Sequence, residues 1–185
     1  MTPISFKANF IRDTYIKQVV TPDTSKDKKV ALVELDINHK NDISALKAVA
    51  RDWDSRAFGY AGCIYDDATK TLKYPDTKEH YYALTTQKED YKNLDPKKIL
   101  GLTLFSDKKF SKNELNWLQV EPDCSYSHSG EYRTYKNVGK ALVNFVKEIS
   151  DKTISVYPAR NATPFYRKLG FEKETSKYPT MLFKK

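Results

Sequence analysis

One segment constrains the fold of this chain more than any other, a strongly amphipathic stretch that lies between two short apolar runs. Its apolar residues recur at the spacing of one face of an α-helix: Val138, Ala141, Leu142, Phe145, Val146 and Ile149. The run 115–120 precedes this helix and the β-branched run 153–157 follows it, and a proline stops each run. A strand, a crossover helix and a second strand normally form a parallel, right-handed unit. This order predicts an open α/β sheet, in which ligands bind beyond the carboxyl ends of the strands.

The start of the predicted helix has the chemistry of an anion site. The N–H groups of a first helical turn have no partner within the helix, and the positive end of the helix dipole favours phosphate. Asn137 and Gly139 tolerate tight or left-handed backbone, and Gly139 also lets a ligand approach closely. Arg133, Lys136 and Lys140 add positive charge around the same turn. An ordinary helix N-terminus with solvated lysines has the same residues, so this stretch does not decide the matter alone.

A second motif, NATPFYRKLGF at residues 161–171, adds the specific signal. With both motifs the chain resembles the GNAT superfamily of acyl-CoA-dependent N-acyltransferases, in which N-A-x-x-F-Y-x-x-L-G-F is a hallmark. The matching residues are Asn161, Ala162, Phe165, Tyr166, Leu169, Gly170 and Phe171. The family's pyrophosphate signature, Q/R-x-x-G-x-G/A followed by K-A-L, corresponds to TYKNVG at residues 134–139 and to KAL at residues 140–142.

The chain departs from the family pattern at three points. Thr134 stands where the family has Gln or Arg, and Asn137 stands at the first glycine. A register slipped by two residues would instead place Lys136, Gly139 and Ala141 in the signature. The inserted loop 123–133 also separates the strand end from the phosphate turn. The resemblance is close over the second half of the chain, and the first half matches by element order only.

The rest of the chain predicts a single domain over residues 1–185. We expect strands over 4–20, 30–37, 79–87, 98–106, 112–120 and 153–157, and a terminal hairpin over 171–183. Residues 1–29 are expected to form an N-terminal edge strand and a loop over 21–29. Helices are expected after an N-cap at Asp42, briefly within 55–77, and around 162–169. The resemblance implies an α/β (α+β) fold with a mixed sheet of about seven strands, helices on both faces and one added N-terminal strand.

Composition excludes several classes of protein. The net charge is +8, but lysines are spread along the chain without the basic and aromatic interleaving that reads single strands, so nucleic acid is not favoured. Cys63 and Cys124 form no disulfide framework, and His39 and His80 have no partners at ligand spacing, so no metal is predicted. No apolar run is long enough for a membrane helix and no signal core is visible, so we expect a cytoplasmic protein.

The resemblance implies acetyl-CoA as co-substrate and gives several residues a role. Tyr166 stands at the position of the acid that protonates the coenzyme thiolate, although a tyrosine at helical spacing is also a common core residue. The backbone N–H of Val120 would serve the thioester carbonyl, and Asn161 would orient the pantetheine arm. The residues expected at the coenzyme are Val120, Arg133, Thr134, Lys136, Asn137, Val138, Gly139, Lys140, Ala141 and Asn161. Glu121 is the best candidate for a general base, and Asp123 and His128 compete with it.

These features predict an N-acetyltransferase in which a neutral amine attacks the thioester directly. The acceptor would be a small-molecule or protein amine, and residues 41–76 and the insertion 123–133 would bind it. The altered phosphate turn also fits a non-catalytic binding protein on the same fold, and the net charge alone supports a nucleic-acid-binding protein. A homodimer that pairs through the added N-terminal strand is a further expectation.

Overall fold

The computed structural model describes residues 8–57, 59–70, 77–126, 130–159, 161–175 and 177–185. The first part of the expected strand 4–20 and the candidate base His128 lie outside these residues. The side chain of Glu131, a residue of the insertion, is also outside the description.

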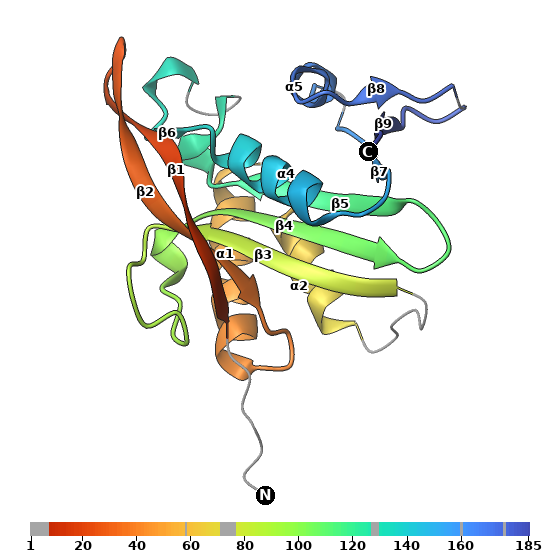
Figure 1. Cartoon of the computed structure of the whole chain (residues 1–185). Helices are drawn as coiled ribbons and strands as arrows, with labels where there is room; N and C mark the ends of the chain where they lie inside the picture. Colours follow the sequence, from red (N-terminus) through yellow and green to blue (C-terminus); the bar gives the residue numbers. More distant parts are fainter. Residues whose placement is uncertain (1–7, 58, 71–76, 127–129, 160, 176) are drawn as a thin grey trace, which may run out of the picture.

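The described chain forms a mixed sheet of nine strands with four α-helices (Figure 1). The strands are β1 (Asn9–Thr21), β2 (Thr24–Leu35), β3 (Thr77–Thr85), β4 (Ile99–Lys108), β5 (Asn113–Val120), β6 (Tyr135–Lys136), β7 (Ile154–Val156), β8 (Glu172–Lys173) and β9 (Met181–Phe183). The helices are α1 (Lys40–Arg56), α2 (Ala61–Thr69), α4 (Val138–Ile149) and α5 (Thr163–Lys168). The order across the sheet is β6-β1-β2-β3-β4-β5-β7-β9-β8.

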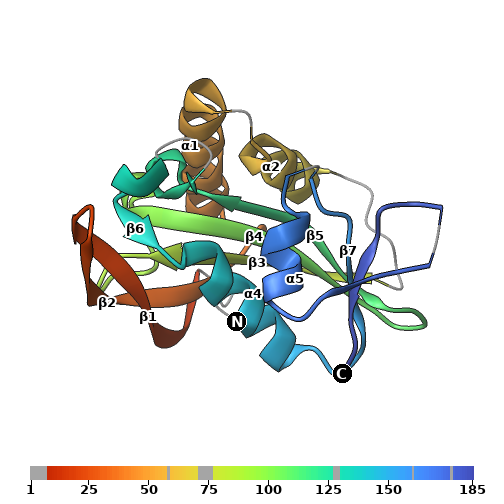
Figure 2. The same cartoon turned by 90° about the horizontal axis from the view of Figure 1, so that it is seen from above.

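Each face of the sheet has its own hydrophobic core, because the buried central strands carry apolar side chains on both faces. On β2, Val30 and Leu32 join the core beneath α4, whereas Ala31, Val33 and Leu35 join the core beneath α1 and α2. Figure 2 shows α1 and α2 on one side of the sheet and α4 on the other. The expected arrangement of helices on both faces is confirmed.

The predicted strand–helix–strand unit is present, since β5 and β7 are parallel and α4 connects them. Their pairing is short, however, and runs only from Asn113 opposite Ile154 to Leu115 opposite Val156. The ladder between β4 and β5 shifts register between Leu104 and Phe105, which leaves Asn116 as an extra residue on β5. Such a bulge bends its strand. Beyond Asn116, β5 continues beside β4 and no longer pairs with β7.

Three expectations about the fold need correction. The expected loop 21–29 is mostly strand, because β1 and β2 continue as a two-stranded ribbon with a tight turn between Thr21 and Thr24. Asp42 is not the N-cap of α1 but lies in its first turn, and His39 is the N-cap. The sheet has nine strands rather than about seven, and β6 is a two-residue strand that pairs with Lys17 and Gln18 of β1.

Candidate functional site

The second half of β5 presents an open backbone edge. The N–H of Glu121 donates to the carbonyl of Leu100 at 2.9 Å, which makes these two residues a hydrogen-bonded pair of the antiparallel ladder. Because hydrogen-bonded and non-hydrogen-bonded pairs alternate, the N–H groups of Leu118 and Val120 point away from β4. They face the side from which β7 has diverged. The predicted N–H of Val120 therefore lies where an extended ligand can pair with β5.

The turn before α4 has the backbone geometry of an anion site. Asn137 is left-handed, with φ +70°, and its side chain does not cap the helix. A left-handed residue followed by a helical one turns successive N–H groups toward a common point, which suits an anion. This conformation explains why the turn takes glycine or asparagine at this position, and it favours the register in which Asn137 replaces the first glycine.

The insertion holds this turn against the sheet. The N–H of Thr134 donates to the carbonyl of Asp123 at 2.8 Å, and the carbonyl of Thr134 accepts from the N–H of Val19 at 3.0 Å. Lys136 then pairs with Lys17 in the short β1–β6 ladder. The phosphate turn is therefore attached both to the end of β5 and to the added N-terminal ribbon.

The first turn of α4 also reaches the open edge. A Cβ at Gly139 would lie 3.4 Å from Phe165 Cζ, 3.5 Å from Val120 Cγ1 and 3.7 Å from Leu118 Cδ2. These are ordinary contact distances, so Gly139 does not depend on the lack of a side chain for packing. The position shows that α4, α5 and the end of β5 meet at one place.

Tyr166 lies beside this meeting point. Its side chain is buried, and its ring contacts Phe165 and Phe171 edge-on, at centroid distances of 5.0 and 5.5 Å. Burial, and to a lesser extent the nearby Tyr60, raises the pKa of the Tyr166 phenol. The phenol is therefore protonated at neutral pH, and the raised pKa makes it a weaker acid than an ordinary tyrosine. Among the described residues its hydroxyl makes no hydrogen bond, which leaves the proton available.

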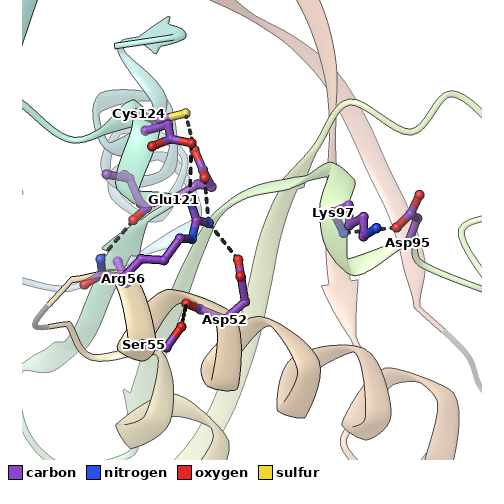
Figure 3. A network of polar contacts seen from close by, with 10 residues as sticks. Asp52, Ser55, Arg56, Asp95, Lys97, Glu121 and Cys124 are labelled. Atoms are coloured by element: carbon purple, nitrogen blue, oxygen red, sulfur yellow. Dashed lines mark hydrogen bonds and ion pairs between the residues drawn. The ribbon is translucent and has the colours of Figure 1, made fainter. Parts of the chain in front are cut away.

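Glu121 lies at the end of β5 in a network of ion pairs (Figure 3). Arg56 Nη2 bonds Glu121 Oε1 at 2.8 Å and Asp52 Oδ2 at 2.7 Å, and Arg56 Nη1 bonds Asp123 Oδ2 at 3.1 Å. The Cys124 thiol donates to Glu121 Oε2 at 3.3 Å. Burial, and then the Glu121 carboxylate, raises the pKa of this thiol, so Cys124 is a neutral thiol rather than a nucleophile.

The α1–α2 connection provides residues that sequence reasoning missed. The Tyr60 ring stacks on Trp117 with centroids 5.1 Å apart, and the Tyr60 N–H donates to Gln119 Oε1 at 3.1 Å. Trp117 and Gln119 stand on the α1 and α2 face of β5, and Trp117 Nε1 donates to Asp67 Oδ2 at 2.7 Å. No local pattern marks these contacts, because their partners are about fifty or sixty residues apart in the chain.

The structure brings the other predicted coenzyme residues together only in part. Val138 is buried beneath the turn, Ala141 is half-buried, and Lys140 and Asn161 are exposed. The guanidinium of Arg133 lies 5.3 Å from the centre of the Tyr126 ring, within the insertion. Among the described residues, no group of His, Cys, Asp or Glu side chains could hold a metal ion, and no helix is long and apolar enough to cross a membrane.

The sequence matches no protein-family model and no curated protein. A solved structure designated as a candidate acetyltransferase, from Exiguobacterium sp. 255-15, aligns with a TM-score of 0.52 and 15% identity over 84% of this chain and 93% of that chain. The ribosomal-protein-S18-alanine N-acetyltransferase of Escherichia coli aligns with a TM-score of 0.44 and 15% identity, over 83% of this chain and 90% of that one. Tetrahymena GCN5 aligns with a TM-score of 0.41 and 13% identity, over 77% and 85%.

The chain has the GNAT fold. This confirms the fold expected from the motifs around residues 134–142 and 161–171. In this GNAT fold, the second half of β5 carries the open edge, α4 begins at the left-handed turn, and α5 carries the buried Tyr166.

Proposed function

We propose that the protein is an N-acetyltransferase that moves the acetyl group of acetyl-CoA to a primary amine. One observation carries the proposal: the open edge of β5, with the N–H groups of Leu118 and Val120, ends beside the uncapped, left-handed turn at Asn137. An extended pantetheine arm would pair with this edge, and its pyrophosphate would meet the first turn of α4. Lys136 and Lys140 supply positive charge around that turn, with Arg133 in the preceding loop.

The reaction we propose is a direct attack. The lone pair of a neutral amine attacks the thioester carbon, a C–N bond forms, and the carbonyl electrons move to oxygen. The Val120 N–H donates to this oxyanion. The C–S bond then breaks, and the departing sulfur takes the proton of Tyr166, while the amine proton passes through water to Glu121. The buried, neutral Cys124 thiol takes no part in this proposed mechanism, which has no covalent enzyme intermediate.

Calorimetric titration of acetyl-CoA tests the binding site. We expect micromolar binding to the wild type and its loss in Gly139→Glu, which places bulk and negative charge at the phosphate turn. Gly139→Ala is the matched control, since its Cβ would make ordinary contacts, and it should bind within a few-fold of the wild type. No binding to the wild type would remove the proposal.

Turnover tests the chemistry. Thiol release from acetyl-CoA would be followed with spermidine, kanamycin and a lysine-containing peptide as acceptors. Tyr166→Phe should lower kcat by about 100-fold or more without weakening acetyl-CoA binding, because a general acid acts in the transition state. Glu121→Gln should lower kcat and leave the Kd of acetyl-CoA unchanged, because an amide cannot accept the proton of the amine. Binding without turnover of any amine would instead support a non-catalytic binding protein on this fold.

A further inference from the structure

The side-chain amide of Gln119 is fixed in one orientation at the open edge. Its Oε1 accepts from the Tyr60 N–H at 3.1 Å, and its Nε2 donates to the Val120 carbonyl at 2.9 Å. The oxygen and nitrogen ends of an amide differ in hydrogen bonding, because only the nitrogen donates. A backbone N–H on one side and a backbone carbonyl on the other therefore admit only one of the two amide orientations.

In this orientation, one N–H of the Gln119 side chain donates no hydrogen bond to the described residues. An amide nitrogen has two N–H groups, and the Val120 carbonyl takes one of them. Among the described residues the second has no partner. The Val120 carbonyl and the Val120 N–H point to the same open edge, because they belong to one non-hydrogen-bonded position of the ladder. The Gln119 amide nitrogen, bonded to that carbonyl, thus lies on the same edge of β5 as the backbone N–H proposed to serve the thioester.

We propose that Gln119 is a catalytic residue whose second N–H donates to the oxyanion of the tetrahedral intermediate, next to the Val120 N–H. This inference rests on the proposed acetyl transfer. As the amine nitrogen bonds to the thioester carbon, the carbonyl electron pair moves to oxygen, and both donors stabilise the negative charge. The negative charge disappears when the electron pair on the oxygen re-forms the carbonyl and the C–S bond breaks. Two donors held in place before the reaction stabilise such a charge better than one.

A purely structural role for Gln119 must be separated from this chemical one. The side chain also joins the α1–α2 connection to β5, and Gly59 leaves room for it, since a Cβ there would lie 2.8 Å from Gln119 Oε1. Loss of this link would lower the free energy of unfolding or raise the KM of the acceptor. Loss of an oxyanion donor would lower kcat and leave substrate binding nearly unchanged, because the donor bonds the oxyanion far more strongly than it bonds the carbonyl of the bound substrate.

The test compares Gln119→Glu and Gln119→Met with the wild type. Gln119→Glu keeps the oxygen that accepts from Tyr60 and removes both N–H donors, and Gln119→Met keeps the length without polar atoms. Asn116→Asp is the matched control, because it makes the same amide-to-carboxylate change in β5 while keeping the oxygen that accepts from Ser106. The measurements are kcat and KM by thiol release, the Kd of acetyl-CoA by calorimetry, and the carbonyl stretch of bound acetyl-CoA labelled with ¹³C at the thioester carbon.

We expect both Gln119 variants to lose kcat by about 100-fold or more, with the Kd of acetyl-CoA within about threefold of the wild type. The labelled carbonyl band should shift to higher frequency in Gln119→Met, because the carbonyl loses a donor, and Asn116→Asp should match the wild type in every measurement. A wild-type kcat in the variants, a change confined to KM, or an unmoved carbonyl band would overturn the inference. If the wild type itself failed to bind acetyl-CoA, the proposed function would fail instead, and that result would be distinct from these.

Discussion

At the scale of single residues, the position of the Gln119 amide depends on the missing side chain of Gly59. A Cβ at Gly59 would lie 2.8 Å from Gln119 Oε1 and 3.0 Å from Gln119 Nε2, closer than packed atoms come. The atoms in the way are the flexible end of one side chain, so they can move without disturbing the backbone. Gly59 therefore matters for where the amide points and hardly for whether the chain folds.

Gly59→Ala should lower kcat at least tenfold while changing the free energy of unfolding by less than about 0.5 kcal/mol, because a displacement of about 1 Å is costly to catalysis and cheap to packing. Steady-state kinetics and thermal unfolding check the two halves of this expectation. The double variant Gly59→Ala with Gln119→Met provides the control, since it should be no slower than Gln119→Met alone. Additive losses would mean that Gly59 acts through something other than Gln119.

The sequence could predict some residues of the site and not others, for a physical reason. The left-handed backbone of Asn137 could be predicted because such a turn restricts the residue type locally, and the φ of +70° agrees with that prediction. Tyr166 could be singled out because its motif resembles that of a known family, and its role stays a prediction. Gln119 and Gly59 could not be singled out, because their contact forms only when the α1–α2 connection meets β5, some sixty residues further along the chain.

At the scale of elements, hydrophobic periodicity predicted the helices and the central strands. It did not predict the two-stranded β1–β2 ribbon, because charged residues fill that segment. Residues 21–29 are polar and predicted a loop, yet Asp27 pairs with Lys17 and Lys29 pairs with Asp13 across β1 and β2. Cross-strand pairs of opposite charge support a solvent-exposed ribbon without a hydrophobic face. The pattern of alternating apolar residues that marks a half-buried strand is therefore missing from a segment that is a strand.

Arg56 joins two elements, since it attaches the end of α1 to the end of β5 and to the loop that leads to the phosphate turn. Arg56→Ala would leave the half-buried Glu121 carboxylate without its cation and should destabilise the fold by about 1–3 kcal/mol. It should also weaken acetyl-CoA binding several-fold, because the turn loses its anchor. Arg56→Lys should recover part of both effects, as it keeps the charge without the bidentate fork.

The control for this experiment is Arg51→Ala, an exposed arginine of the same helix. It should match the wild type in thermal unfolding and in the Kd of acetyl-CoA measured by calorimetry. If Arg56→Ala were equally harmless, the network in Figure 3 would be a surface ion cluster without a positioning role.

Asp42 is a buried carboxyl in the first turn of α1, and its Oδ1 makes no hydrogen bond with the part of the chain that the structure describes. Its other oxygen accepts from the Asp36 N–H at 2.8 Å. Burial raises the pKa of Asp42 above its ordinary value of 3.8. A raised folded-state pKa means that protonation stabilises the fold, and this stability is lost as the pH rises through the folded pKa.

Asp42→Asn should therefore stabilise the protein at neutral pH, by about 1 kcal/mol or about 2–4 °C in Tm, because the amide keeps the acceptor for Asp36 and carries no charge. The advantage should shrink as the pH falls from neutral toward 4 and should disappear below it, where the wild-type carboxyl is protonated as well. Thermal unfolding over this pH range checks the expectation. A gain independent of pH would show that the charge is not its cause.

At the scale of the whole molecule, the candidate site depends on two helical connections that lie on opposite faces of the sheet. The helices α1 and α2 return the chain to β3 on one face of the sheet, and α4 carries it from β5 to β7 on the other. The bulge at Asn116 and the short β5–β7 pairing then open the sheet between two cores. Neither the length of that pairing nor the bulge has a signal in residues 113–120, so the sequence predicted a parallel pair and could not predict where it opens.

Acetyl-CoA should close this opening and stabilise the entire fold. At a concentration of 100 Kd the ligand adds about 2.7 kcal/mol to the free energy of unfolding, which corresponds to a rise in Tm of roughly 5–10 °C.

Hydrogen exchange at short labelling times locates the effect within β5. The amides of Leu118 and Val120 face the open edge and should exchange fast without ligand and slowly with it, whereas the amides of Gln119 and Glu121 already bond to β4 and should be slow in both states. If all four amides responded alike, the ligand would be stabilising the fold from elsewhere, and the open edge would not be its binding surface.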